Sequence, residues 1–271
     1  MRLRACGFAL FALFFSALSA AQTKAIVTFA RLKDLEYIGN FYDGDAGPNL
    51  GLQFTANAQA IISASQGGSG NFINNPGKSP VMFFQTGQSI TMTATNGIQT
   101  GLWFYYSALQ PGAATVYSGP NGTGNILASV TLTPNNSGCT GYKLCVWSPV
   151  AVPLSSTAGS ISFAGVPNYL AIGAMHLGYA VPTSSALTSS QNPSVHGEPV
   201  TFTATVTAVG TTAVGNVTFK AGNQVVGVVP TVGGIASITL SSLKTGSTHI
   251  NAKFQGTGFG NSAARLVQVV N

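Results

Sequence analysis

Apolar and polar residues alternate along much of the chain, which predicts β-strands. Residues 200–208 read Val-Thr-Phe-Thr-Ala-Thr-Val-Thr-Ala, and the same period of two recurs at 216–220 and 89–95. Every second side chain of a strand faces the same side of its sheet, so this pattern is typical of half-buried strands. Gly, Pro and Asn interrupt the runs every ~8–12 residues, as in β-sandwich and barrel proteins. No helical apolar stripe occurs after residue 21, and we expect an all-β protein.

The first 21 residues have the pattern of a secretory signal peptide. Arg2 and Arg4 give a basic start, residues 8–18 form an apolar run with one serine, and Ser-Ala-Ala ends the segment at Ala21. The run has about half of the ~20 residues that a membrane-spanning helix needs, so cleavage before Gln22 is preferred to an anchor. We therefore expect an exported protein, secreted or at the cell surface, without a transmembrane segment after cleavage.

Charge is scarce along the whole chain. It has 11 basic and 5 acidic residues, and charged residues are only 6% of the total, whereas an average globular protein has roughly 25%. Ser, Thr, Asn, Gln and Gly must therefore supply the polar surface, which excludes coiled coils and charged disordered tails. Lys and Arg do not cluster anywhere, so we expect no nucleic-acid partner.

A change of composition near residue 183 predicts two domains, residues 22–182 and 183–271. The first holds both Trp, all eight Tyr and four of the five acids, and the second contains no Trp, Tyr or Cys. Between them, Pro182 and a run rich in Ser and Thr are typical of a linker. In the second domain we expect seven short strands, folded as an immunoglobulin-like sandwich. They lie near residues 186–191, 199–208, 214–220, 224–230, 234–241, 247–255 and 263–270.

Two cysteines remain after the signal peptide, Cys139 and Cys145. An exported chain meets an oxidising compartment, so an even pair at short spacing predicts a disulfide. A metal site would need further Cys or His ligands, and none lies nearby in the sequence.

The C-terminal residues also resemble a known family. Residues 190–206, Ser-Gln-Asn-Pro-Ser-Val-His-Gly-Glu-Pro-Val-Thr-Phe-Thr-Ala-Thr-Val, resemble the opening of the bacterial Ig-like repeat of large surface proteins, and 215–220 and 242–256 continue the likeness. Where that family usually has an aromatic-Ser-Gly-Asp run, this chain reads Phe254-Gln-Gly-Thr257, without the acid. The resemblance implies a spacer or adhesive module rather than an enzyme.

The N-terminal domain resembles a second family. Residues 40–58 are similar to the start of β-sandwich domains in exported PEP-CTERM-type bacterial proteins, and 101–107, 115–128 and 160–165 continue the likeness. The acidic residues that often close that domain are replaced here by Ile-Gly-Ala-Met-His-Leu-Gly at 172–178. We expect a jelly-roll-like sandwich for this part of the chain.

The acids are the most unevenly placed residues. Four of the five fall within residues 34–45, and Asp43 and Asp45 share a Gly- and Pro-containing loop with Asn49. Oxygen-rich loops can bind calcium, although the spacing is not that of an EF-hand. Two interpretations stay open. Asp43 and Asp45 hold a structural Ca²⁺ or a ligand with Asn49, or the loop is a solvated turn whose Asp side chains cap their own backbone.

Aromatic residues give further candidates for binding. Alternation puts Trp103 and Tyr105 on one face of a strand and Phe104 and Tyr106 on the other, and one of these pairs must enter the core. Tyr142 and Trp147 flank the predicted disulfide, which would hold their loop rigid. We therefore take Tyr142 and Trp147 as candidates for stacking on a sugar.

Catalytic motifs are missing from the sequence. There is no Gly-x-Ser-x-Gly or His-Glu-x-x-His, and the three histidines are far apart, so we expect no catalytic residues and no enzyme. Apart from the calcium, no cofactor is expected. The favoured function is extracellular binding or adhesion, with the Ig-like module as spacer and a polysaccharide or a surface protein as partner. The alternatives are a structural matrix component without a small ligand and, third, a secreted hydrolase.

Overall fold

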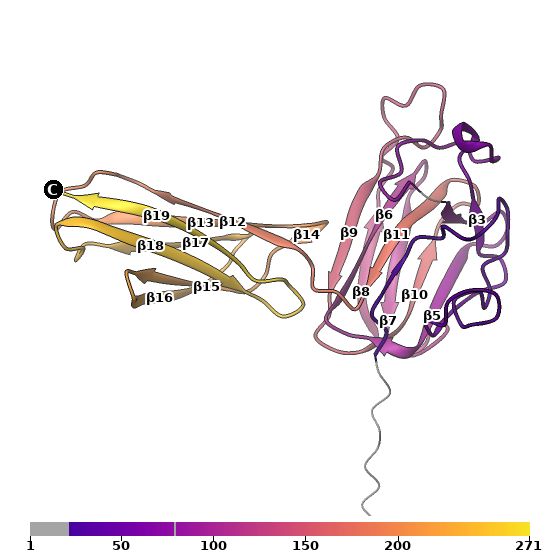
Figure 1. Ribbon diagram of the computed structural model, residues 1–271, viewed down its shortest axis with the longest axis horizontal. Coiled ribbons are helices and arrows are strands. Elements are labelled where there is room, and N and C mark those ends of the chain that lie inside the picture. Colours follow the sequence, from indigo (N-terminus) through magenta and orange to yellow (C-terminus); the bar gives the residue numbers. More distant parts are fainter. Residues whose placement is uncertain (1–21, 79) are drawn as a thin grey trace, which may run out of the picture.

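The structure, a computed structural model, describes residues 22–78 and 80–271 and consists of two β-sandwiches joined by a short connection (Figure 1). The predicted signal peptide, residues 1–21, lies outside the described residues. Within them, one single-turn 3-10 helix, η1 (Ala64–Gln66), interrupts a succession of strands. The predicted all-β class is confirmed.

The first sandwich is a jelly roll with short strands added. Its strands are β1 (Ala25–Val27), β2 (Leu52–Phe54), β3 (Gln59–Ile61), β4 (Val81–Phe83), β5 (Ser89–Ile98), β6 (Gly101–Ala108), β7 (Gly112–Tyr117), β8 (Ile126–Leu132), β9 (Ser148–Pro153), β10 (Ala158–Ala164) and β11 (Leu170–Leu177). One sheet has the order β3-β4-β11-β6-β9, with β1 also paired to β11, and the other has β2-β5-β10-β7-β8. From β4 to β11 this is the jelly-roll order, which confirms the predicted architecture.

The core of the first sandwich forms where the inward side chains of its two sheets meet. Phe104 of β6 and Phe163 of β10 approach from opposite sheets, with ring centroids 5.1 Å apart at an edge-to-face angle of 86°. Tyr106 is buried on the same side of β6 as Phe104. Of the two alternatives left by the sequence, it is therefore Trp103 and Tyr105 that face outward.

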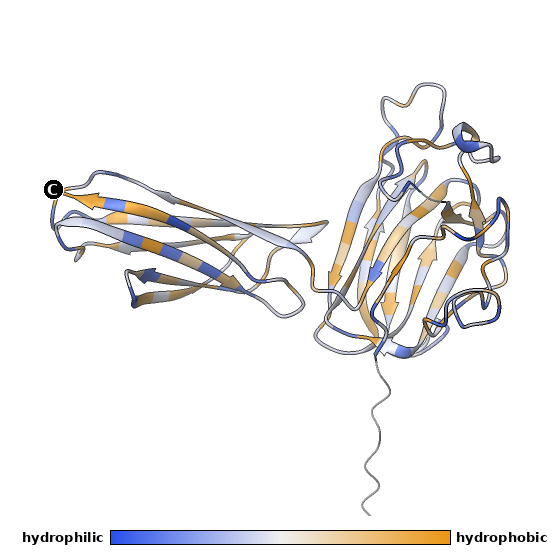
Figure 2. Ribbon diagram, in the orientation of Figure 1, coloured by the Kyte–Doolittle hydropathy of each residue, from blue (hydrophilic) through white to orange (hydrophobic). Residues whose placement is uncertain are grey.

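The second sandwich has two four-stranded sheets. Its strands are β12 (Thr183–Ser189), β13 (Val200–Ala208), β14 (Thr211–Thr212), β15 (Asn216–Ala221), β16 (Gln224–Pro230), β17 (Ile235–Leu240), β18 (Gly246–Gln255) and β19 (Ser262–Val270). In one sheet β13 pairs with β12, β14 and β17, and the other has the order β16-β15-β18-β19. The colours of Figure 2 alternate along β18, in which Ile250, Ala252 and Phe254 are buried and the residues between them are partly or fully exposed. The seven predicted strands are present.

Two details of this sandwich differ from the prediction. Strand β12 begins at Thr183 rather than near residue 186, within the run rich in Ser and Thr that was expected to be a linker, because Thr183 to Ser189 pair in register with β13 from Ala208 to Phe202. The two-residue strand β14 was not predicted, since it is too short to show alternation and, in the part of the chain that the structure describes, pairs with the end of β13 alone. The linker between the last strand of the first sandwich and the first strand of the second is therefore short and consists of residues 178–182.

The sandwiches touch through the backbone at two glycines. Ala151 N–H of β9 donates to Gly210 O at 3.3 Å, and a Cβ at Gly258 would lie 2.6 Å from Thr100 O, between β5 and β6. Gly210 has a φ of +64°, and a Cβ there would lie 2.8 Å from the carbonyl carbon and oxygen of Pro149. Only glycine combines this backbone conformation with such a close approach.

We expect Gly210→Ala to separate the two sandwiches without unfolding either, because the added methyl group collides with the backbone of β9. Small-angle scattering should show a larger radius of gyration, and proteolysis between residues 178 and 182 should be faster. Gly222→Ala is the matched control, since Gly222 also has a positive φ, +59°, but has open space around it. Identical scattering and cleavage rates for the two variants would refute the expectation.

Candidate functional site

The Asp43 loop is held together by its own hydrogen bonds. An isolated β-bridge pairs Asp43 with Asn49, and the Asp43 carboxylate accepts a hydrogen bond of 2.7 Å from Gln53 Nε2. Asn49 Oδ1 accepts from Gly51 N–H at 3.2 Å. Asp45 is exposed. Among the described residues, no three of His, Cys, Asp and Glu lie close enough to hold a metal ion together, and the calcium site stays a prediction.

The other two acids of this region stabilise turns. Asp34 accepts from Ile62 N–H at 2.8 Å and from Ser69 N–H at 3.0 Å, one bond to each carboxylate oxygen. Glu36 accepts from Lys33 N–H at 2.6 Å. Asp34 thus ties the turn that carries Leu35 to the segment after β3.

The solvated-turn interpretation predicts that millimolar calcium leaves the Tm unchanged, because the Asp43 carboxylate already accepts a hydrogen bond from Gln53 and, of the four acids of this region, Asp45 alone accepts none from the described residues. Thermal unfolding with calcium or with EDTA measures this. The Asp45→Asn variant serves as control. A rise in the Tm of the wild type that Asp45→Asn abolishes would instead establish the cation site.

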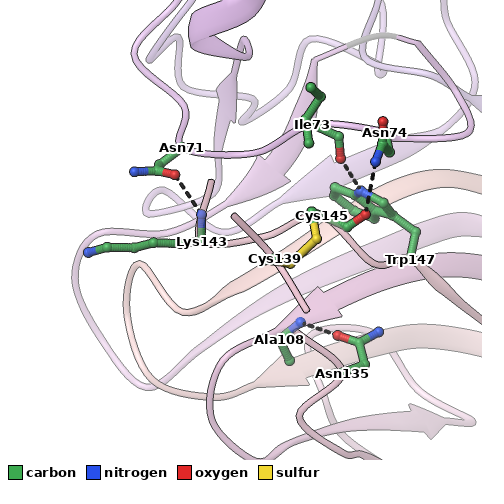
Figure 3. Close-up of a disulfide and its surroundings, with 9 residues drawn as sticks. All are labelled: Asn71, Ile73, Asn74, Ala108, Asn135, Cys139, Lys143, Cys145 and Trp147. Atoms are coloured by element: carbon green, nitrogen blue, oxygen red, sulfur yellow. Dashed lines mark hydrogen bonds between the residues drawn. A yellow bond between two sulfur atoms is a disulfide. The ribbon is translucent and has the colours of Figure 1, made fainter. Parts of the chain in front are cut away.

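The predicted disulfide between Cys139 and Cys145 is present (Figure 3). Its loop is attached to the segment after η1, since Asn71 Oδ1 accepts from Lys143 N–H at 2.6 Å and Leu144 O accepts from Ile73 N–H at 3.0 Å. At the base of the loop, Asn135 Oδ1 accepts from Ala108 N–H of β6 at 2.9 Å. These bonds hold the loop over the end of the six-stranded sheet.

Of the two aromatic residues predicted beside the disulfide, Trp147 is used for packing. Its indole Nε1–H donates to Ile73 O at 2.9 Å, and its ring meets Phe72 edge to face with centroids 6.0 Å apart. Tyr142 is half-buried within the loop. Ligand binding by Tyr142 and Trp147 stays a prediction, and so does binding by the Asp43 loop.

A cluster of aromatic rings lies on the outer face of the six-stranded sheet, which we call the aromatic face. Trp103 and His176 are stacked, with ring centroids 3.5 Å apart and planes at 8°. Tyr105 meets Trp103 edge to face at 5.9 Å, and Tyr179 meets His176 in the same way at 6.1 Å. All four side chains are half-buried, so the face combines solvent access with a fixed arrangement of rings.

A β-bulge brings His176 to the aromatic face. The pairing of β11 with β6 changes register between Ile172 and Met175, and both of these side chains lie in the core. With strict alternation Ile172 and His176 would point the same way, whereas the extra residue reverses the direction of the residues that follow. The sequence shows no signal for the bulge. The aromatic candidates taken from the sequence therefore included Trp103 and Tyr105 but neither His176 nor Tyr179.

The electrostatics of the aromatic face are set by its burial. Desolvation lowers the pKa of His176 from the usual 6.5, and the ring neighbours of His176 described above carry no charge. Lys24 Nζ lies 4.9 Å from the centre of the Tyr179 ring, within the range of a cation–π contact. At neutral pH the cluster is therefore an uncharged surface with one ammonium group at its edge.

The lowered pKa predicts that acid destabilises the fold through His176. The unfolded chain binds a proton at this residue below about pH 6.5, while the folded chain resists it, so this contribution is full above pH 6.5 and is lost as the pH falls through the lower folded value. We expect the Tm of the wild type to fall between neutral pH and pH 5 more steeply than that of His176→Gln. Parallel slopes for the two proteins would contradict this.

Residues 187–271 match the family model of the bacterial Ig-like domain, group 3. The comparison confirms the C-terminal resemblance. The likeness of residues 40–58 to PEP-CTERM-type domains stays a prediction, and no curated protein sequence matches the chain. Through residues 22–78 and 80–271 there is no helix with the length and apolar character that crossing a bilayer requires.

Several solved structures are similar to the chain at low identity. A family 6 carbohydrate-binding module shares 10% identity over 58% of this chain and 94% of its own, with a TM-score of 0.32. The fibronectin(III)-like modules of CbhA from Clostridium thermocellum share 15% over 68% of this chain and 84% of their own, at 0.30. β-Glucuronidase 3 of Bacteroides uniformis shares 8%, with 69% of this chain matching 27% of that enzyme, at 0.26. At such values the likeness assigns no site and no ligand.

Proposed function

We propose that this chain is an extracellular binding or adhesion protein that holds a polysaccharide on the aromatic face, with the Ig-like domain as its spacer. The observation that carries the proposal is the ring cluster of Trp103, Tyr105, His176 and Tyr179 on the outside of a sheet. A sandwich needs side chains of this size in its core, and here three of them lie on the opposite side of β6 and β11, with Tyr179 of the connection beside them.

Sugar chemistry fits such a surface. The C–H groups on one face of a pyranose ring are apolar and pack on aromatic rings, while its hydroxyl groups remain hydrated or take hydrogen bonds from the rim. Tyr105 and Tyr179 add phenolic hydroxyls, and Lys24 adds an ammonium group beside Tyr179. A scarcity of charge elsewhere on the chain favours an uncharged partner over a strongly acidic one.

The position of the second sandwich supports its role as spacer. Trp103 is partly buried and packs against the core cluster of the second sandwich, which also includes Ala151 of β9 and Val181 of the connection. The aromatic face therefore begins where the two sandwiches meet. The glycine contacts at Gly210 and Gly258 limit bending there. An Ig-like module attached in this way would carry the binding domain at a fixed angle.

A glycan array followed by affinity electrophoresis with the polysaccharides it selects tests the proposal. We expect Tyr105→Ala and Tyr179→Ala each to weaken retention by about tenfold, which corresponds to ~1.4 kcal/mol, the upper part of the range for an aromatic contact.

The matched control is Tyr37→Ala, since Tyr37 is 65% exposed and does not belong to the aromatic face. Its retention should equal that of the wild type. Failure of the wild type to bind any glycan would refute the proposal and favour a structural matrix component, and equal losses in all three variants would exclude a specific face.

A further inference from the structure

A hollow of about 310 Å³ lies at the other end of the same sheet face, beside the disulfide loop. Its apolar lining comes from β3, β4, the start of β11 and the segments that cross them: Leu35, Ile61, Phe72, Phe83, Leu144, Leu170 and Ala171. None of the four residues of the aromatic face contributes to it. The volume is at the lower end of the ~300–1,000 Å³ of ligand pockets and suits a single small ring.

Three amide side chains line the same hollow, Asn71, Gln85 and Asn168, together with Ser69 and Lys143. Asn71 uses its Oδ1 to hold the backbone of Lys143, and Figure 3 shows its Nδ2 turned away from that bond. Gln85 and Asn168 are exposed and, among the described residues, their side-chain amides take part in no hydrogen bond. Each amide offers a donor and an acceptor at once.

One residue of the lining, Leu35, holds an unfavourable backbone conformation. Its φ is 62°, in the left-handed region that branched and large side chains rarely adopt, whereas the φ of 66° at Asn168 is one that asparagine tolerates. Leu35 is also 39% exposed, which makes it one of the large apolar side chains in contact with solvent. A strained backbone and an exposed leucine at the same cavity are typical of a functional site, such as a ligand-binding site.

We propose that the hollow binds one sugar ring that bears an acetamido group. The methyl of that group would enter between Phe83, Phe72 and Leu144, where a hydroxyl group would lose its hydration without a partner. The N–H and C=O of the same group require a donor and an acceptor together, as the side chains of Gln85 and Asn168 provide. The hollow has room for a single ring, so it would select the end or a branch of a glycan, and its lining is separate from the aromatic face.

A fully buried polar side chain lies next to one residue of the lining, although it does not itself line the hollow. Ser107 of β6 is the register partner of Ala171 on β11, and its hydroxyl is buried without a hydrogen-bond partner among the described residues. Cross-strand partners point to the same side of a sheet, so this hydroxyl lies on the outer side next to the apolar floor.

Titration calorimetry and saturation-transfer NMR with N-acetylglucosamine, N-acetylgalactosamine, glucose and glucuronate test the proposal. We expect at least one acetamido sugar to bind. Glucose and glucuronate should each bind at least about tenfold more weakly than that sugar. No binding of either acetamido sugar, or equal binding of glucose or glucuronate, would overturn the assignment.

Two variants locate the binding without unfolding the site. Leu35→Asn and Asn168→Gly both suit a positive φ, so we expect the Tm to stay equal or rise while acetamido-sugar binding weakens by about tenfold. Ile126→Asn is the control, because Ile126 is 62% exposed on β8 of the opposite sheet. Unchanged binding in both hollow variants would overturn the proposal.

The aromatic-face variants separate this inference from the proposed function. The double variant Tyr105→Ala/Tyr179→Ala should bind the acetamido sugar as the wild type does. Loss of the sugar in that variant would assign its binding to the aromatic face and would overturn the separate site.

Discussion

The pairing of β11 on both of its sides is the constraint on which the other features of the first sandwich depend. It pairs with β6 along one edge and with β4 and β1 along the other. Its inward side chains Ile172, Met175 and Leu177 are buried in the core, so the strand cannot shift in register without exposing them. The bulge between Ile172 and Met175 then determines which side chains after it, including His176, face the outside of the sheet.

Both candidate binding regions are built on the outward side of this strand. Ala171 at its start lines the hollow, and His176 near its end stacks on Trp103 of β6. Between them Gly173 leaves room for Asn75, whose Oδ1 would lie 2.9 Å from a Cβ at that position. A crossing segment thus covers the middle of the strand and separates the hollow from the aromatic face.

The scarcity of charge has a structural counterpart in how polar groups are used. Hydroxyl side chains pair across strands of the second sandwich, as in Thr201 with Thr239 at 2.8 Å and Thr203 with Ser237 at 3.0 Å. Four of the five acids accept hydrogen bonds from backbone or amide groups, and Glu198 does so with Val195 N–H at 3.1 Å. A sparsely charged surface with fixed turns suits contact with neutral, hydroxyl-rich partners, in accord with the proposed function.

The sequence by itself determined the all-β class, the two sandwiches, the Ig-like strands and the disulfide, because each depends on local alternation, turn residues or short spacing. Phe202, Phe219 and Phe254 are buried as the period of two predicts. Tertiary structure alone decided which face of β6 enters the core, since alternation separates Trp103 from Phe104 without orienting either. It also decided the position of His176, which depends on a bulge in the pairing, and the hollow, whose lining comes from segments between Leu35 and Ala171 that are distant in sequence.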